Sequence, residues 1–182
     1  MTREKTVSKE GLRTKELVAA AVMCAVTAVL SQIAVPLPSG VPVTLQTFAV
    51  ALCAYILETR YAAASMAVYL LLGLVGVPVF ANFGAGPGKL AGLTGGFLWG
   101  FLLFCVIASF SMRQKRVPVR IAAGILGLLV CHLCGVIQFS ALSGTGFGAS
   151  LLLVSLPYLP KDILSVVLAY LVAGRIRPLI RR

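Results

Sequence analysis

Acidic residues and histidine are scarce in this sequence. Only five of its 182 residues are Asp or Glu and one is His, whereas 59% are hydrophobic. A single histidine excludes a His-Glu-x-x-His zinc site, and Asp162, the one acid within an apolar run, cannot form a carboxylate dyad. A membrane enzyme is therefore disfavoured. A binding or transport protein needs only a largely apolar pocket with a few polar groups.

A complete nucleotide-binding loop is also missing. The stretch GAGPGKLAG, residues 84–92, resembles the end of a P-loop at Gly88 and Lys89. However, Leu90 stands where Ser or Thr would bind magnesium, and Phe83 occupies the position of the first glycine. The sequence therefore predicts no ATP hydrolysis by this motif.

The cysteines indicate neither a disulfide framework nor a metal site. There are five of them, and an odd number cannot pair completely. The stretch CHLC, residues 131–134, has the spacing of metal ligands, but no second pair of ligands lies nearby in the sequence. Because small cysteines suit helix packing in lipid, we predict no bound metal.

Long apolar runs dominate the rest of the sequence. Its mean hydropathy is +1.00. Runs of about 20 apolar residues can cross the roughly 30 Å hydrocarbon core of a membrane as helices. We therefore predict an all-α membrane protein, a bundle of six transmembrane helices at residues 16–35, 42–57, 61–80, 93–112, 119–140 and 151–173.

The basic residues indicate how these helices are oriented. A net charge of +11 would suggest nucleic acid if it covered a soluble face. Instead, Lys and Arg concentrate in the first 15 residues, in the tail and in the connections after the second and fourth predicted helices. By the positive-inside rule, both termini are predicted to be cytoplasmic. We expect a basic segment over residues 1–15 at the lipid headgroups, a transmembrane domain over residues 16–182, and no nucleic-acid partner.

Gly and Pro collect in the connections on the opposite side, at residues 36–42, 81–92 and 140–150. Irregular backbone at membrane depth is tolerated only where it is buried in protein or lines a cavity. These connections are therefore the best candidates for a binding site.

Asp162 is the most unusual charged residue, because a charge in mid-bilayer costs about 2.5–3.5 kcal/mol or more. It lies in the stretch LPYLPKDILSVV, where Pro160 suits the first turn of a helix. We expect a helix to begin near Pro160 and residues 151–157 to form a separate short element. Two roles for Asp162 remain open. It is a structural residue, capping the helix or pairing with Lys161 or Lys89, or it is a ligand-binding carboxylate that accepts hydrogen bonds from the N–H groups of a polar solute.

Two sets of small residues predict close helix packing. Ala21 and Ala25 lie four residues apart in the first apolar run, where they either pack within this protein or dock another subunit. Gly92, Gly96 and Gly100 form a second ladder, for which we favour internal packing.

Four stretches together resemble the BioY family, the biotin-specific S components of energy-coupling-factor (ECF) transporters. They are VPVTLQTFAVALCAYIL (41–57), YLLLGLVGVPVFANFGAG (69–86), LAGLTGGFLWGF (90–101) and YLPKDIL (158–164). The resemblance implies six membrane helices and capture of biotin from outside, with no cofactor in this chain. ATP is then used by partner subunits, a transmembrane T subunit and two cytoplasmic ATPases, which fits a sequence without its own P-loop.

The resemblance also implies roles for individual residues. Ala21 and Ala25 match the surface by which S components dock the T subunit, and the expected location is a bacterial cytoplasmic membrane, crossed several times. Biotin's ureido ring would be bound by Asp162 as acceptor and Asn82 as donor, and its carboxylate by Lys161 or Lys89. The apolar wall is expected from Phe80, Phe83, Tyr69 and Tyr158, with Thr44 and Gln46 ordering or closing the pocket.

The sequence departs from the family pattern around Asp162. Many members have Gly just before this Asp and Lys three residues after it, whereas here these positions hold Lys161 and Ser165. Which lysine meets the carboxylate is therefore open. The alternative function is a self-sufficient carrier or channel for biotin or another small solute, a homo-oligomer with Asp162 as a proton or ion site.

Overall fold

A computed structural model describes residues 2–38 and 40–180, with side chains from residue 13 onward. The chain is mostly helical, as predicted. In chain order the helices are α1 (Thr2–Ser31), α2 (Gln46–Ile56), α3 (Thr59–Leu74), α4 (Pro87–Ala91), α5 (Gly95–Ser111), α6 (Val117–Ser143), α7 (Phe147–Val154) and α8 (Leu159–Ile180), with a short 3-10 helix, η1 (Ala81–Phe83), before α4.

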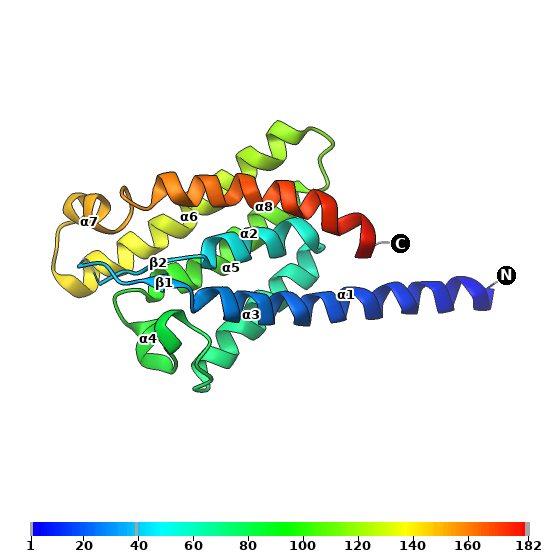
Figure 1. Ribbon diagram of the computed structural model, residues 1–182, viewed down its shortest axis with the longest axis horizontal. Helices are drawn as coiled ribbons and strands as arrows, with labels where there is room; N and C mark the ends of the chain where they lie inside the picture. The colour runs from blue at the N-terminus through cyan, green and yellow to red at the C-terminus, as the bar shows by residue number, and fades with distance from the viewer. Residues whose placement is uncertain (1, 39, 181–182) are drawn as a thin grey trace.

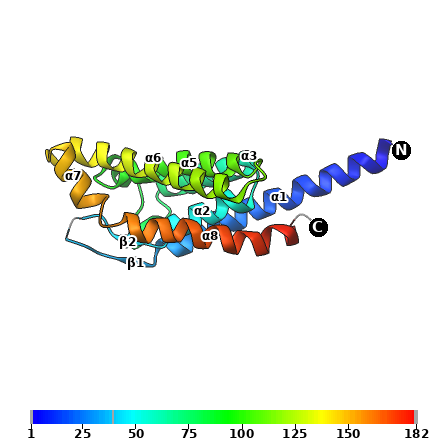
Figure 2. The same cartoon turned by 90° about the horizontal axis from the view of Figure 1, so that it is seen from above.

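The long helices form an elongated bundle, with both termini at one end (Figures 1 and 2). At its centre lies α2, in which every residue except Phe48 is buried. A helix that is apolar all round is stable only when other helices surround it. Helices α5 and α8 both pack against α2, and α6 lies along α5.

The predicted spans differ from the helices in length and in number of elements. Within the part of the chain that the structure describes, three helical segments are long and apolar enough to cross a membrane: Arg13–Ser31 within α1, α6 and α8. Helices α2, α3 and α5 are apolar but shorter than the runs that predicted them. The run at 151–173 is not one helix, because the chain leaves α7 at Val154 and enters α8 at Leu159. The start of α8 near Pro160 confirms the prediction made from this residue, and Pro157 also favours the break.

The end opposite the termini contains elements that an all-helical prediction omits. Strand β1 (Ala34–Val35) pairs antiparallel with β2 (Val43–Thr44), so the connection after α1 is a short hairpin. The connection after α3 contains η1 and then turns at Gly86, whose φ of 85° favours glycine. Pro87 follows in the first turn of α4, where its missing N–H costs nothing.

Glycines bring α5 and α6 close together. A Cβ on Gly96 would lie 2.2 Å from the Cys134 carbonyl oxygen, and one on Gly100 would lie 2.7 Å from the Cys131 Cα. Both distances are too short for any side chain, so the predicted internal packing of this ladder is confirmed at Gly96 and Gly100. Ala21 and Ala25 on α1, by contrast, are exposed.

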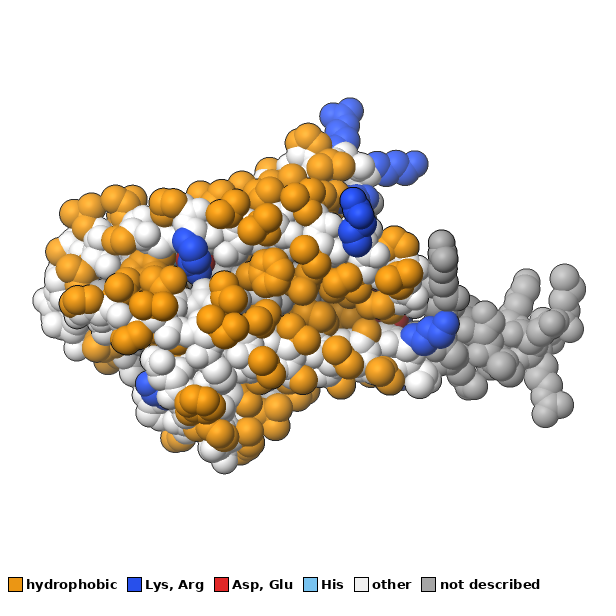
Figure 3. All heavy atoms as spheres, viewed as in Figure 1, with side chains coloured by type: hydrophobic (Ala, Val, Ile, Leu, Met, Phe, Trp, Pro, Cys, Tyr) orange, Lys and Arg blue, Asp and Glu red, His pale blue; other side chains and the backbone are white. Residues whose placement is uncertain are grey.

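The surface divides into two kinds of region. Figure 3 shows hydrophobic side chains over the flanks of the bundle, and Lys and Arg mainly at the end where the termini lie. Large apolar side chains as exposed as Val75 (75%) and Val29 (66%) are unusual in water but are expected against lipid.

Candidate functional site

A cavity lies among the irregular connections and the helix ends at the end opposite the termini. Its volume of about 120 Å³ is several times what one water molecule requires. The apolar part of its wall includes Phe80, Phe97, Leu98, Phe101, Leu128 and Val154. Its ionisable and amide side chains are Asp162, Lys161, His132, Lys89, Asn82 and Gln46. A largely apolar wall with a few polar groups is the usual form of a small-molecule site.

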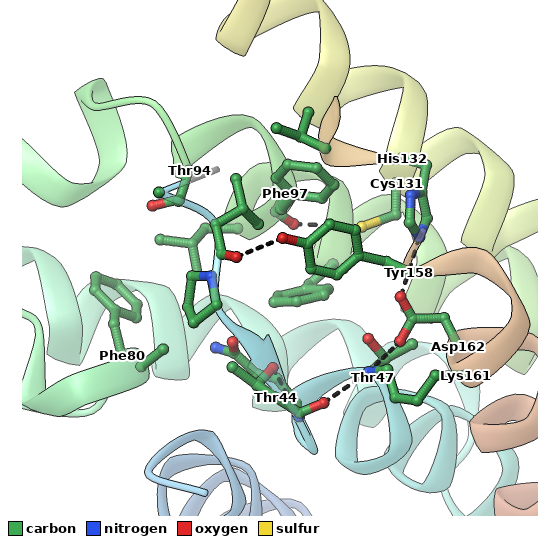
Figure 4. A pocket seen from close by; sticks show the side chains of 18 of the residues that line it. Thr44, Thr47, Phe80, Thr94, Phe97, Cys131, His132, Tyr158, Lys161 and Asp162 are labelled. Atoms are coloured by element: carbon green, nitrogen blue, oxygen red, sulfur yellow. Dashed lines mark hydrogen bonds and ion pairs between the residues drawn. The ribbon is translucent and has the colours of Figure 1, made fainter. Parts of the chain in front are cut away.

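Asp162 lies in the first turn of α8 and is 5% exposed. Its Oδ1 pairs with the Lys161 ammonium, and its Oδ2 lies 3.2 Å from Nε2 of His132 on α6 (Figure 4). Helix N-terminal N–H groups also favour a carboxylate in this turn. The two side-chain partners and the helix end together offset the cost of burying this charge.

Lys161 links α8 to the hairpin. Besides Asp162, it reaches β2, where its Nζ donates to the Thr44 carbonyl oxygen at 2.7 Å. The Thr44 hydroxyl in turn accepts from the backbone N–H of Gln46 at 3.2 Å, at the start of α2. Lys161 therefore fixes the position of β2 relative to the buried carboxylate.

His132 is held on both ring nitrogens. Because a carboxylate only accepts, Nε2 carries a proton toward Asp162, while Nδ1 lies 3.0 Å from the Ser155 hydroxyl. The Phe97 ring meets the imidazole edge-on at 5.7 Å between centroids. A chain of Ser, His and Asp invites comparison with hydrolases. Ser155, however, is 1% exposed and does not line the cavity, so its hydroxyl is not an accessible nucleophile. The hydrogen bonds from Ser155 through His132 to Asp162 instead orient the carboxylate.

Hydrogen bonds to backbone carbonyls hold the aromatic side chains. The Tyr158 hydroxyl donates to the Val41 carbonyl oxygen at 2.5 Å, joining the start of α8 to the hairpin. Tyr69 bonds to the Gln46 amide, and its hydroxyl donates to the Val79 carbonyl oxygen at 3.0 Å. Its ring packs edge-on against Phe80, with 5.5 Å between centroids. Tyr69 thus supports the cavity wall from behind.

Asn82 lies on η1 in the left-handed backbone region, with φ 56° and ψ 43°, followed by Phe83 with φ 54°. Asn tolerates this conformation, whereas for Phe it is an outlier that surrounding contacts must hold in place. One such contact comes from Gln32 at the end of α1, whose Oε1 accepts from the Phe83 N–H at 2.8 Å. The same side chain donates to the Ala28 carbonyl oxygen at 2.9 Å. Gln32 therefore connects α1 to the residue beside Asn82.

The structure brings together eight of the ten predicted ligand residues. The residues that line the cavity are Asn82, Asp162, Lys161, Lys89, Thr44, Gln46, Phe80 and Tyr158. Phe83 does not: the residue is 72% exposed and lies outside the cavity wall. Tyr69 does not either, since it lies behind Phe80. Both expectations about the wall are corrected.

Sequence reasoning missed the part of the site that α5 and α6 provide. His132 was considered only as a metal ligand, and Phe97, Phe101 and Leu128 were not considered. A signal for His132 existed, because a polar, ionisable side chain within a membrane run marks a functional position by default. Among the described residues, no group of three or more His, Cys, Asp or Glu side chains could hold a metal.

Comparison with known proteins identifies the family. The sequence profile of the BioY family matches residues 2–182. The chain is 35% identical over 174 residues to "Biotin transporter BioY" of Thermotoga maritima, covering 91% of this chain and 97% of that protein. It is 34% identical over 166 residues to "Probable biotin transporter BioY" of Pyrococcus horikoshii, covering 91% of this chain and 98% of that protein.

A solved structure has the same fold. It is a crystal structure of the S-component for biotin from an ECF-type ABC transporter, with a TM-score of 0.84 at 23% identity, covering 91% of this chain and 92% of that one. Since the profile spans nearly the whole sequence and the relatives match it almost end to end, the chain belongs to the BioY family.

Proposed function

We propose that this protein is the biotin-binding S component of an ECF-type vitamin transporter. The observation that carries the proposal is the buried carboxylate of Asp162, held by Lys161 and His132 at the wall of a largely apolar cavity. The biotin transporters among its relatives and its fold match to an S-component support this assignment over a self-sufficient carrier.

Biotin's chemistry complements this cavity. The ureido ring has N–H donors for the Asp162 carboxylate and a carbonyl oxygen that accepts from the Asn82 amide. The thioether ring and the alkyl chain need apolar surface, which Phe80, Phe97 and Phe101 supply. Because the polar groups of this site are buried, a solute that leaves them unpaired binds poorly.

The biotin carboxylate meets Lys89 in this proposal, and Lys161 has a positioning role. Lys161 already donates to the Thr44 carbonyl oxygen and pairs with Asp162. Among the described residues, the Lys89 ammonium has no hydrogen-bond or ion-pair partner, and this exposed side chain lines the cavity from α4. An available ammonium at the mouth of the cavity suits the polar end of an extended ligand.

Transport then depends on partner subunits. The exposed Ala21 and Ala25 on α1 form the surface for the transmembrane T subunit, since small residues allow helix backbones to approach closely. Two cytoplasmic ATPases supply the ATP hydrolysis. In this arrangement the protein crosses a bacterial cytoplasmic membrane six times, with both termini on the basic, cytoplasmic side.

Calorimetric titration of biotin into detergent-purified protein tests the proposal. We expect tight binding without ATP in the wild type and roughly 100-fold weaker binding in Asp162→Asn, because the amide presents a donor where an acceptor is needed. Glu58→Gln is the matched control, since it makes the same chemical change to an acid outside the cavity. Its affinity should equal that of the wild type.

The possible outcomes have different consequences. No biotin binding by a well-folded wild type would contradict the proposed function. Tight binding that Asp162→Asn leaves unchanged would retain biotin capture but remove Asp162 from recognition.

A further inference from the structure

A second cleft lies at the basic end of the bundle, between the start of α6 and the last turns of α8. Its volume is about 520 Å³, and three guanidinium groups line it: Arg120 from α6, and Arg175 and Arg177 from α8. None of its described lining residues is acidic. A pocket of this charge attracts an anion.

Arg120 is fixed in place at this cleft. Its Nε donates to the Gln114 carbonyl oxygen at 2.7 Å, and its Nη1 lies 3.4 Å from the Tyr170 hydroxyl on α8. The planar guanidinium has further N–H groups, which can bind an oxyanion through two parallel hydrogen bonds. Because Arg120 is already ordered, it loses little side-chain entropy when an anion binds.

The surroundings of the cleft are apolar. Leu171 on its wall is 60% exposed, and Leu179, about two turns further along α8, is 68% exposed. Val117, at the start of α6, is 47% exposed. Figure 3 likewise shows hydrophobic side chains extending along the flank to the basic end. A ligand that fits has an anionic head for the arginines and an apolar body for the flank.

We propose that this cleft binds the phosphate group of an anionic phospholipid. Basic pockets between membrane helices are suited to such headgroups. The proposal is independent of biotin. The competing explanation is that these arginines only orient the protein in the membrane and stabilise the C-terminal end of α8. In that case the three guanidinium groups would not need to line the same cleft.

Native mass spectrometry of the detergent-purified protein, with added phosphatidylglycerol or phosphatidylcholine, tests the proposal. We expect phosphatidylglycerol to bind in preference to phosphatidylcholine. Replacing two arginines, as Arg120→Gln with Arg175→Gln, should weaken phosphatidylglycerol binding roughly tenfold or more. The matched control, Lys115→Gln with Arg116→Gln, removes the same charge at the same end but outside the cleft, and should change binding less than about twofold.

Two further arms keep the test decisive. Arg120 also joins α6 to α8, so Arg175→Gln alone is measured as well, because this exposed side chain has a lesser structural role. Glycerol phosphate distinguishes a lipid from a free phosphate: it should fail to displace the lipid, since it lacks acyl chains. Equal losses in both double variants, no lipid preference, or displacement by glycerol phosphate would each overturn the proposal.

Discussion

The bundle has an ion pair near each end, and the two pairs differ in the exposure of the acid and in the distance between the charged atoms. Asp162 is 6% exposed through its side chain, contacts Lys161 directly and receives a second bond from His132. Glu58 and Arg60 are 48% and 70% exposed, and their closest charged atoms are 3.7 Å apart. Water screens the second pair, whereas protein surrounds the first.

The difference extends to the backbone around each pair. At the end with the cavity, the connections contain a hairpin, a left-handed turn at Asn82 and the short helices α4 and α7. At the end with the termini, the connections after α2 and α5 are short and carry basic residues. We infer that one end is built for recognition and the other for orientation, and the following predictions test that division.

The largest effect is expected from breaking the two ion pairs in the same way. Lys161→Met leaves a buried carboxylate with fewer partners and should reduce stability by about 2 kcal/mol and abolish measurable biotin binding. This loss of stability is smaller than the full cost of an unpaired buried charge, because His132 still donates to Asp162 and the Lys161 side chain is already 32% exposed. Arg60→Met should lower the free energy of unfolding by less than about 0.5 kcal/mol. Thermal denaturation in detergent measures both, and equal losses would contradict the contrast between the two ends.

Lys89→Met should have the next largest effect, on ligand affinity alone. If Lys89 binds the carboxylate, biotin affinity falls by about tenfold, while affinity for the neutral biotin carboxamide stays the same. Lys115→Met removes a lysine from the other end and should affect neither ligand. A tenfold loss for both ligands would instead make Lys89 a structural residue.

Gln32→Ala tests how the left-handed turn is held. It removes the acceptor for the Phe83 N–H, so Asn82 should be less well ordered and biotin affinity should fall about fivefold. Gln114→Ala is the control at the basic end, where the backbone carbonyl rather than the side chain accepts from Arg120. Unchanged affinity in Gln32→Ala would mean that other contacts suffice to hold the turn.

The smallest effect on biotin affinity is expected from the exposed face of α1. Ala21→Leu with Ala25→Leu should change affinity less than twofold but prevent co-purification with the T subunit, because the larger side chains keep the helices apart. Ala64→Leu on α3, which is also exposed, should preserve co-purification. Co-purification of both variants would place the docking surface elsewhere.

Local sequence patterns predicted several features correctly. Pro160 predicted the start of α8 and thus the position of Asp162 in a first helical turn, because proline suits the first turn of a helix and constrains the residue before it. The glycine ladder predicted close internal packing, which the structure shows to be against α6, and the apolar runs predicted helices. Of the eight predicted ligand residues that line the cavity, all but Lys89 came from stretches with a recognisable family pattern.

By itself, then, the sequence determined the helical class, which follows from its composition, and the family resemblance, which implies eight of the residues that line the cavity. Only the tertiary structure decided that His132 supports Asp162, that Lys161 also binds Thr44, and that Phe83 turns outward while Tyr69 lies behind Phe80. The Lys161–Thr44 contact joins residues 117 positions apart in the sequence, and the backbone at Phe83 has a positive φ. No local sequence pattern encodes such a long-range contact or this backbone angle.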